Sequence, residues 1–194
     1  MRIVGLGGSL AAESKSRAAL ATGLSGAQEA GAETVLLDLR ELDLPLYSTE
    51  VEPTPDVLRL VETLESADGL IWSSPLYQGS ISGSFKNALD WLHLPSGNVY
   101  LTDKVIGLIS VAGGTQGLQA INTMEFCVRA LRAWAVPLVV AVPRAAVMEE
   151  ATERQLRMLG SEVVRIAEHF VTEHEPEHER VCAEAAERLA AVAA

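Results

Sequence analysis

The sequence is poor in cysteine and has no apolar run long enough to cross a membrane. Its two cysteines, Cys127 and Cys182, lie far apart and outside any Cys-x-x-Cys spacing, which argues against a disulfide framework and against a zinc knuckle. We expect both thiols to be buried or incidental. No apolar run reaches the ~18 residues that a bilayer span requires. The chain starts with a strand-like segment and shows no signal-peptide anatomy, so a cytoplasmic location is predicted, with no membrane partner.

Positive charge is also scarce. The 15 lysines and arginines are outnumbered by 26 aspartates and glutamates, which gives a formal net charge of -11. Such a charge repels the phosphate backbone of nucleic acids and argues against binding to them. It does not prevent binding of a small anionic ligand, because backbone amides and one or two cations can hold a phosphate locally.

Three familiar site motifs are missing or interrupted. Residues 5–10 ("GLGGSL") have leucine where a dinucleotide fingerprint requires its third glycine, and no Gly-Lys-Ser/Thr ends a Walker loop. Residues 174–178 ("HEPEH") match the H-E-x-x-H zinc pattern, but Pro176 should break the helix that would place both histidines on one face. We therefore predict no metal site and interpret this segment as an acidic turn between helices.

What the sequence does contain is a regular alternation of strand-like and helix-like segments. Hydrophobic residues make up 48% and charged residues 21% of the 194 residues, which is typical of one globular domain, here residues 1–194. Buried strands are predicted at residues 2–8, 33–39, 69–73, 104–114 and 136–143, and helices at 14–30, 56–66, 84–92 and 115–135, with two C-terminal helices from about residue 149 that separate near Pro176. This alternation predicts an α/β fold with a parallel sheet that helices cover on both faces.

Three predicted strands end in loops rich in glycine and hydroxyl groups: "GGSLAAESKSR", "SSPLYQGS" and "AGGTQG". In an open parallel sheet such loops meet at the carboxyl edge, where ligands bind. The first loop can wrap an anion, because Gly8 permits close backbone approach and its serines donate hydrogen bonds. Ser14 can also cap the next helix, whose amino-terminal amides attract negative charge, and Lys15 and Arg17 are the cations nearby. The alternative is a capped helix after a tight turn.

The loop after the third strand combines apolar and polar groups. Pro75 cannot donate to a strand ladder and should end the pairing. Leu76 and Tyr77 offer flat apolar surface, while Gly79 and Ser80 offer backbone amides. This mixture suits a planar heteroaromatic ring with polar edges, although a simple turn with an exposed tyrosine is the alternative. The Gly-Gly-Thr segment at 113–115 offers a second close approach to such a ring, or merely starts a helix.

In order and spacing, "GGSLAAES", "ADGLIWSSPLYQGSISGSFKNALDWL" and "GLISVAGGTQG" resemble the NADPH-dependent FMN reductases of the flavodoxin-like superfamily. The resemblance covers residues 2–143, and its most specific part is 74–92. It implies a flavodoxin-like three-layer sandwich with a five-stranded parallel sheet, an FMN site, NADPH or NADH as electron donor, and homodimers or homotetramers.

The resemblance also implies which residues bind the flavin. Ser9, Ser14 and Ser16 would hold the FMN phosphate, with Arg17 or Lys15 as the cation. The residues bordering the ring and the ribityl chain would be Pro75, Leu76, Tyr77, Gln78, Gly79 and Ser80. The residues along the other edge of the ring would be Gly113, Gly114 and Thr115.

The chain departs from the family pattern at two positions. Ala11 stands where many members have an arginine, so the phosphate loses a bidentate partner unless Arg17 or Lys15 substitutes. Gln78 stands where members often have asparagine. Weak retention of FMN would fit an enzyme that treats the flavin as a substrate.

The resemblance implies transfer of a hydride from the nicotinamide to FMN, which supplies reduced flavin. Because the flavin carries the chemistry, we predict binding residues and no catalytic acid, base or nucleophile. Two alternatives stay open. One is an FMN-containing NAD(P)H reductase of quinones or azo compounds. The other is a non-catalytic flavodoxin-like electron carrier, although the T-x-T-G-x-T phosphate loop of such carriers is absent.

Overall fold

A computed structural model describes residues 1–94, 100–144 and 148–192 of the protein, the last segment with side chains up to residue 171. The strands are β1 (Arg2–Gly7), β2 (Glu33–Asp38), β3 (Gly69–Pro75), β4 (Val105–Ala112) and β5 (Trp134–Pro143). The α-helices are α1 (Lys15–Glu29), α2 (Pro55–Glu65), α3 (Gly83–Asp90), α4 (Leu118–Ala130) and α5 (Glu150–Val192). Two short 3-10 helices, η1 (Leu39–Glu41) and η2 (Trp91–His93), follow β2 and α3.

The five strands form one sheet in the order β2-β1-β3-β4-β5, and every neighbouring pair is parallel. This confirms the predicted five-stranded parallel sheet, and the order is that of flavodoxin-like doubly wound folds. The chain order reverses between β1 and β3, which lie side by side. The crevice outside the carboxyl ends of these two strands is where such folds bind ligands.

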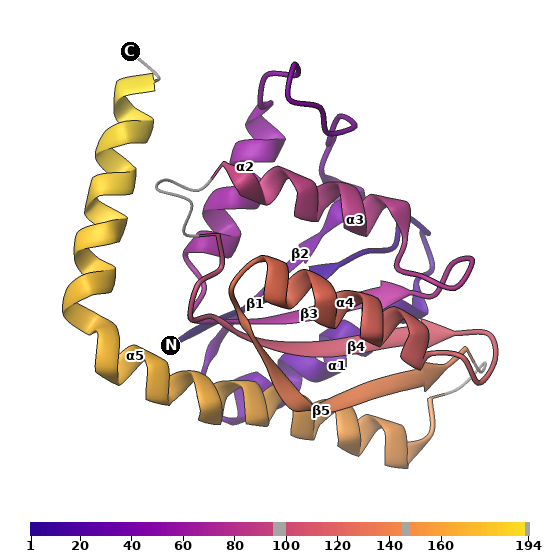
Figure 1. Ribbon diagram of the computed structural model, residues 1–194. Helices are drawn as coiled ribbons and strands as arrows, with labels where there is room; N and C mark the ends of the chain where they lie inside the picture. The colour runs from indigo at the N-terminus through magenta and orange to yellow at the C-terminus, as the bar shows by residue number, and fades with distance from the viewer. Residues whose placement is uncertain (95–99, 145–147, 193–194) are drawn as a thin grey trace.

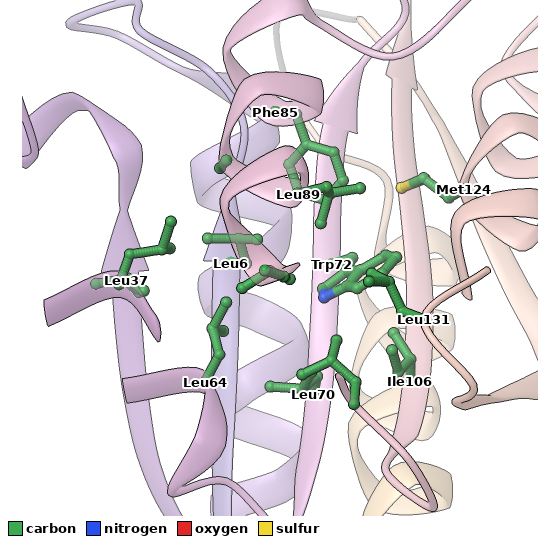
Figure 2. Packing of buried hydrophobic residues seen from close by; sticks show 14 of the residues in the cluster. Leu6, Leu37, Leu64, Leu70, Trp72, Phe85, Leu89, Ile106, Met124 and Leu131 are labelled. Carbon is green, nitrogen blue, oxygen red and sulfur yellow. The ribbon is translucent and has the colours of Figure 1, made fainter. Parts of the chain in front are cut away.

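Helices cover both faces of the sheet, which confirms the predicted three layers. Helices α2, α3 and α4 lie on one face, and α1 and α5 lie on the other (Figure 1). Successive residues of a strand point to opposite faces, so on β3 Trp72 enters the first core and Ile71 the second. Figure 2 shows Phe85 and Leu89 of α3 above Trp72 in the first core.

The α1–α5 layer depends on glycines that let two helix backbones touch. A Cβ atom placed on Gly160 of α5 would lie 1.9 Å from the carbonyl oxygen of Gly23, and one on Gly26 of α1 would lie 2.0 Å from that of Arg157. These separations are far inside van der Waals contact, so no larger residue fits while the helices stay in place. The close crossing fixes α1 against the rest of the domain, and α1 begins at the predicted anion loop.

One predicted helix is too long at both ends. The predicted helix 115–135 is shorter in the structure, because α4 starts at Leu118 and stops at Ala130. Arg132 takes a left-handed conformation with φ of 63°, which ends the helix, and Trp134 already begins β5. The sequence offered no glycine or proline there to mark the stop.

The predicted break near Pro176 is also wrong. The structure has one continuous helix α5 where two helices were expected (Figure 1). A proline inside a helix removes one backbone hydrogen bond and crowds the preceding turn, which ends some helices and only kinks others. The acidic turn expected at residues 174–178 is therefore part of a helix.

Candidate functional site

The loop between β1 and α1 is held in place by hydrogen bonds from β3 and from the start of α3. The Gly8 amide donates to the Ser73 carbonyl oxygen at 2.8 Å. The Ser82 and Ser84 hydroxyls both donate to the Gly8 carbonyl oxygen, at 2.5 and 2.9 Å. A Cβ atom on Gly8 would lie 2.7 Å from Cδ2 of Phe85. The absent side chain of Gly8 thus makes room for Phe85, whereas the sequence had suggested room for an anion.

The start of α1 faces the same space. Ser14 is its N-cap, because the Ser14 side chain accepts a hydrogen bond from the Arg17 amide at 3.1 Å, as predicted. The first amides of a helix have no partner within the helix and carry a partial positive charge, which favours an anion there. The loop and the helix end together form a surface suited to a phosphate.

The Ser16 hydroxyl is occupied within the protein. Its Oγ lies 2.7 Å from Oγ of Ser73, and the Ser73 hydroxyl donates to the Ser16 carbonyl oxygen at 2.9 Å. Because Ser73 has only one hydroxyl hydrogen, Ser16 supplies the hydrogen between the two hydroxyls. Ser16 can therefore donate to a ligand only through its backbone amide, while its hydroxyl oxygen can still accept a hydrogen bond. The Ser16–Ser73 pair also ties α1 to the end of β3.

A tight turn follows β3. Tyr77 and Ser80 exchange backbone hydrogen bonds of 2.9 and 3.0 Å, and between them Gln78 and Gly79 have φ angles of 47° and 81°. Two successive positive φ angles define the primed turn that favours glycine. The turn leaves the Tyr77 side chain 53% exposed at the rim of the site, where a flat ligand can contact it.

These loops enclose a pocket of about 460 Å³, within the range of small-molecule sites. Its lining residues are Ser9, Ala11, Glu13, Ser14, Lys15, Ser16, Ala18, Pro75, Leu76, Tyr77, Val111, Gly113 and Arg144. The structure thus brings together predicted site residues from all three loops. Those that do not line the pocket are Arg17, Gln78, Gly79, Ser80, Gly114 and Thr115.

Arg17 is directed to a different partner. Its Nε donates to Oδ2 of Asp38 at 2.9 Å, and the Asp38 side chain is only 5% exposed. The Arg40 amide donates to the other oxygen of Asp38 at 3.1 Å. This arrangement ties α1 to the end of β2, outside the pocket lining.

Two charged residues of the pocket were missed from the sequence. Arg144 follows β5, and its amide donates to the Ala112 carbonyl oxygen at 2.7 Å, so it lies beside the end of β4. The carboxyl ends of all parallel strands meet at one edge, but the sequence directly after β5 has no glycine or hydroxyl residue to indicate a ligand loop. Glu13 brings a negative charge into the same lining.

Two ionisable groups with raised pKa values, Glu65 and Cys127, lie outside the pocket lining. Burial raises the pKa of the Glu65 carboxyl at the end of α2, against the opposing effect of Lys104. Burial likewise raises the pKa of the Cys127 thiol in α4. Both residues belong to helices on the α2–α4 face of the sheet.

Neither a metal centre nor a membrane helix is found in the described part of the chain. No group of three or more His, Cys, Asp or Glu side chains there is arranged to hold a metal ion. The side chains of His174 and His178 lie outside the described residues. No described helix is both long enough and apolar enough to span a bilayer.

Comparison with known proteins adds to this geometry. The NADPH-dependent FMN reductase ArsH of Acidithiobacillus ferrooxidans is 36% identical over 116 residues, which are 59% of this chain and 48% of that protein. The NADPH azoreductase of a Bacillus species (strain OY1-2) is 36% identical over 109 residues, 54% of this chain and 58% of the relative. The chain therefore spans about half the length of the curated relatives it matches.

Solved structures share the fold. The flavoenzyme NAD(P)H:(acceptor) oxidoreductase FerB of Paracoccus denitrificans superimposes with a TM-score of 0.74 at 24% identity, covering 87% of this chain and 98% of that one. The family model for NADPH-dependent FMN reductases matches residues 1–147, which include the β1, β3 and β4 loops and Arg144. The chain belongs to the NADPH-dependent FMN reductase family.

Proposed function

We propose that the protein is an NAD(P)H-dependent FMN reductase, in which a hydride passes from the nicotinamide to FMN and reduced flavin is supplied. The observation that carries this proposal is the pocket at the reversal of strand order. It joins a serine-rich loop and a helix start on one side to an aromatic rim on the other, in a chain of this family.

The pocket residues fit the chemistry of FMN. Ser9, Ser14 and the first amides of α1, with Lys15 beside them, provide donors and positive charge for a phosphate. Leu76 and Tyr77 provide an apolar surface for a ring. A volume of about 460 Å³ is large enough for a ligand of this class.

The remaining predicted residues complete the proposed site. The backbone of the turn at Gln78, Gly79 and Ser80 would meet the polar edge of the ring. A Cβ atom added to Gly113 or Gly114 would meet no heavy atom within 4 Å, so the space over this loop is open to a second ligand. We assign that open side, together with Thr115, to the approach of the nicotinamide.

When bound, FMN supplies the centre that accepts the hydride. The chain's own residues hold the two rings at a fixed separation and orientation, which lowers the entropic part of the barrier. The hydrogen bonds that fix the Gly8 carbonyl and the Ser16–Ser73 pair keep the loop rigid. We therefore assign positioning to the protein and no proton transfer to its side chains.

The pocket charges bear on whether FMN is exchanged. Ala11 offers no cation, Arg17 is paired with Asp38, and Glu13 offsets one of the two positive charges, Lys15 and Arg144, that line the pocket. We infer that FMN dissociates readily and acts as a substrate. Purification with stoichiometric, non-exchanging FMN would refute this inference.

A second candidate is an FMN-containing NAD(P)H reductase of azo compounds or quinones. The similarity to the NADPH azoreductase favours it. It uses the same pocket and differs only in where the electrons go next.

One assay separates these readings. Purified protein is mixed with NADPH or NADH, with and without added FMN, FAD or riboflavin, and absorbance of the reduced nicotinamide is followed. Oxidation that requires excess free flavin supports the reductase. Oxidation by bound flavin that requires an azo compound or a quinone supports the second candidate. Absence of oxidation despite flavin binding indicates an electron carrier and refutes both.

We also propose that the protein forms homodimers or homotetramers. Leu118 and Phe126 on α4 are 55% and 70% exposed, and Trp134 at the start of β5 is 56% exposed. Exposed large apolar side chains are common at subunit interfaces. Light scattering of wild type and of Phe126→Glu tests this, since the variant should shift towards monomer. The predicted cytoplasmic location stays a prediction.

A further inference from the structure

We propose that Arg144, at the end of β5, is the cationic contact for the FMN phosphate in this chain. It would take the role that the family resemblance gives to an arginine at position 11 and that the sequence suggested for Arg17. This inference rests on the proposed function and concerns how this particular site binds its anion.

Arg17 is committed elsewhere. Its Nε is held 2.9 Å from Oδ2 of Asp38, whose side chain is 5% exposed. Turning Arg17 into the pocket would leave the nearly buried Asp38 carboxylate with only the Arg40 amide as a hydrogen-bond donor, which is unfavourable. Position 11 is an alanine and offers only a methyl group. Neither position 17 nor position 11 therefore supplies an arginine to the phosphate.

Arg144 is well placed to replace them. The hydrogen bond from its amide to the Ala112 carbonyl oxygen, 2.7 Å long, extends the β4–β5 ladder and fixes its backbone at the carboxyl edge of the sheet. From there it lines the pocket together with Ser9, Ser14 and Lys15. Within the part of the chain whose side chains are described, no ion pair ties its guanidinium to a carboxylate.

The guanidinium group matches the proposed ligand. Its planar fork can donate two parallel hydrogen bonds to a phosphate, which a lysine ammonium group cannot do. A Cβ atom placed on Gly113 or Gly114 would meet no heavy atom within 4 Å, so these two residues leave open space at the end of β4.

Charge balance makes Arg144 decisive. The charged residues lining the pocket are Glu13, Lys15 and Arg144, so one positive charge remains after Glu13 is offset. Without Arg144 the lining would have no net charge, while the FMN phosphate is an anion. Glu13 is expected to oppose binding and Arg144 to overcome that opposition.

The test compares FMN with riboflavin, which has the same ring system and no phosphate. Dissociation constants for both are measured by flavin fluorescence titration of wild type, Arg144→Gln, Glu13→Gln and Arg17→Gln. Arg59→Gln is the matched control, because it removes the same charge from an exposed position of α2 that does not line the pocket. Circular dichroism of each variant checks that it is folded.

We expect Arg144→Gln to weaken FMN binding about 10-fold or more, the loss typical of a charge-assisted contact. Riboflavin binding should change by less than about 2-fold. Glu13→Gln should strengthen FMN binding and leave riboflavin binding unchanged, and the control should change neither.

Three results would overturn the role of Arg144. The first is a preference for FMN over riboflavin that survives Arg144→Gln. The second is a preference that is lost more completely in Arg17→Gln than in Arg144→Gln. The third is an Arg144→Gln variant whose KM for NADPH rises while its FMN affinity is unchanged, which would place the arginine on the nicotinamide. Wild-type protein that binds neither flavin would instead refute the proposed function itself.

Discussion

The close contact between Gly8 and Phe85 fixes the loop after β1, so a change there should affect both the stability of the fold and the shape of the pocket. Gly8→Ala tests this. A Cβ atom on Gly8 would lie 2.7, 2.8 and 3.0 Å from Cδ2, Cβ and Cγ of Phe85. Phe85 is fully buried and packs edge-on against Trp72, with ring centroids 5.6 Å apart. Rotating the Phe85 ring does not relieve the clash with its own Cβ atom, so α3 and the loop must move apart.

The expected cost follows from overpacking of a filled core. Such insertions lower the free energy of unfolding by about 1–3 kcal/mol. Replacing glycine with alanine also restricts the unfolded chain, which returns about 0.4–1 kcal/mol. The net loss should therefore be about 1–2 kcal/mol, or a fall in Tm of roughly 2–8 °C for a chain of this size. FMN binding should weaken as well, because the displaced loop carries Ser9.

Gly83→Ala is the matched control. Gly83 is the first residue of α3, and a Cβ atom there would meet no heavy atom within 4 Å. This variant should range from neutral to about 1 kcal/mol more stable than wild type, with FMN binding unchanged. Urea denaturation measures the free energy of unfolding of both variants. Equal stability of the two variants would refute the claim that Gly8 is reserved for Phe85.

Two further predictions concern parts of the fold away from the pocket. Gly160→Ala should lower the free energy of unfolding by about 3 kcal/mol, the upper end for overpacking. The new Cβ atom would lie 1.9 Å from the Gly23 carbonyl oxygen, a backbone atom that cannot rotate away. A loss under about 0.5 kcal/mol in urea denaturation would contradict the close helix crossing. Glu65→Gln should stabilise the protein at neutral pH, because burial raises the pKa of Glu65 above its usual 4.5 in the folded state. The folded state then binds the proton more tightly than the unfolded state. The contribution of Glu65 to the free energy of unfolding therefore falls as the pH rises from 4.5 through the raised pKa. Urea denaturation should give wild type and Glu65→Gln equal free energies of unfolding at acidic pH and a difference that grows as the pH rises to neutral. A difference independent of pH would contradict the prediction.

The fold was largely predictable because buried parallel strands are apolar runs that end at glycines or polar residues. The predicted strands at residues 2–8, 33–39 and 69–73 correspond to β1, β2 and β3. Helix ends were less predictable. Arg132, two residues after the end of α4, has a left-handed φ of 63°, and an arginine in the sequence does not predict that conformation. The continuity of α5 through Pro176 depends on whether the helix kinks or ends, which local sequence does not decide.

The site was partly predictable for a related reason. Loop composition placed serines, glycines and Tyr77 at the carboxyl edge, and the structure brings these loops to one pocket. Side-chain direction was not predictable. Arg17 turns to Asp38, 21 residues further along the chain, and Arg144 reaches the pocket from the far strand. Both depend on which strands become neighbours, and that is a property of the sheet order.

Titration of FMN with the purified protein, followed by flavin fluorescence, tests the central claim most directly. If the β1, β3 and β4 loops form a flavin site, the fluorescence should change and saturate at one FMN per chain, and FMN should bind more tightly than riboflavin. No association of either flavin at concentrations up to about 1 mM, where a binding free energy of about -4 kcal/mol is still detected, would contradict the account.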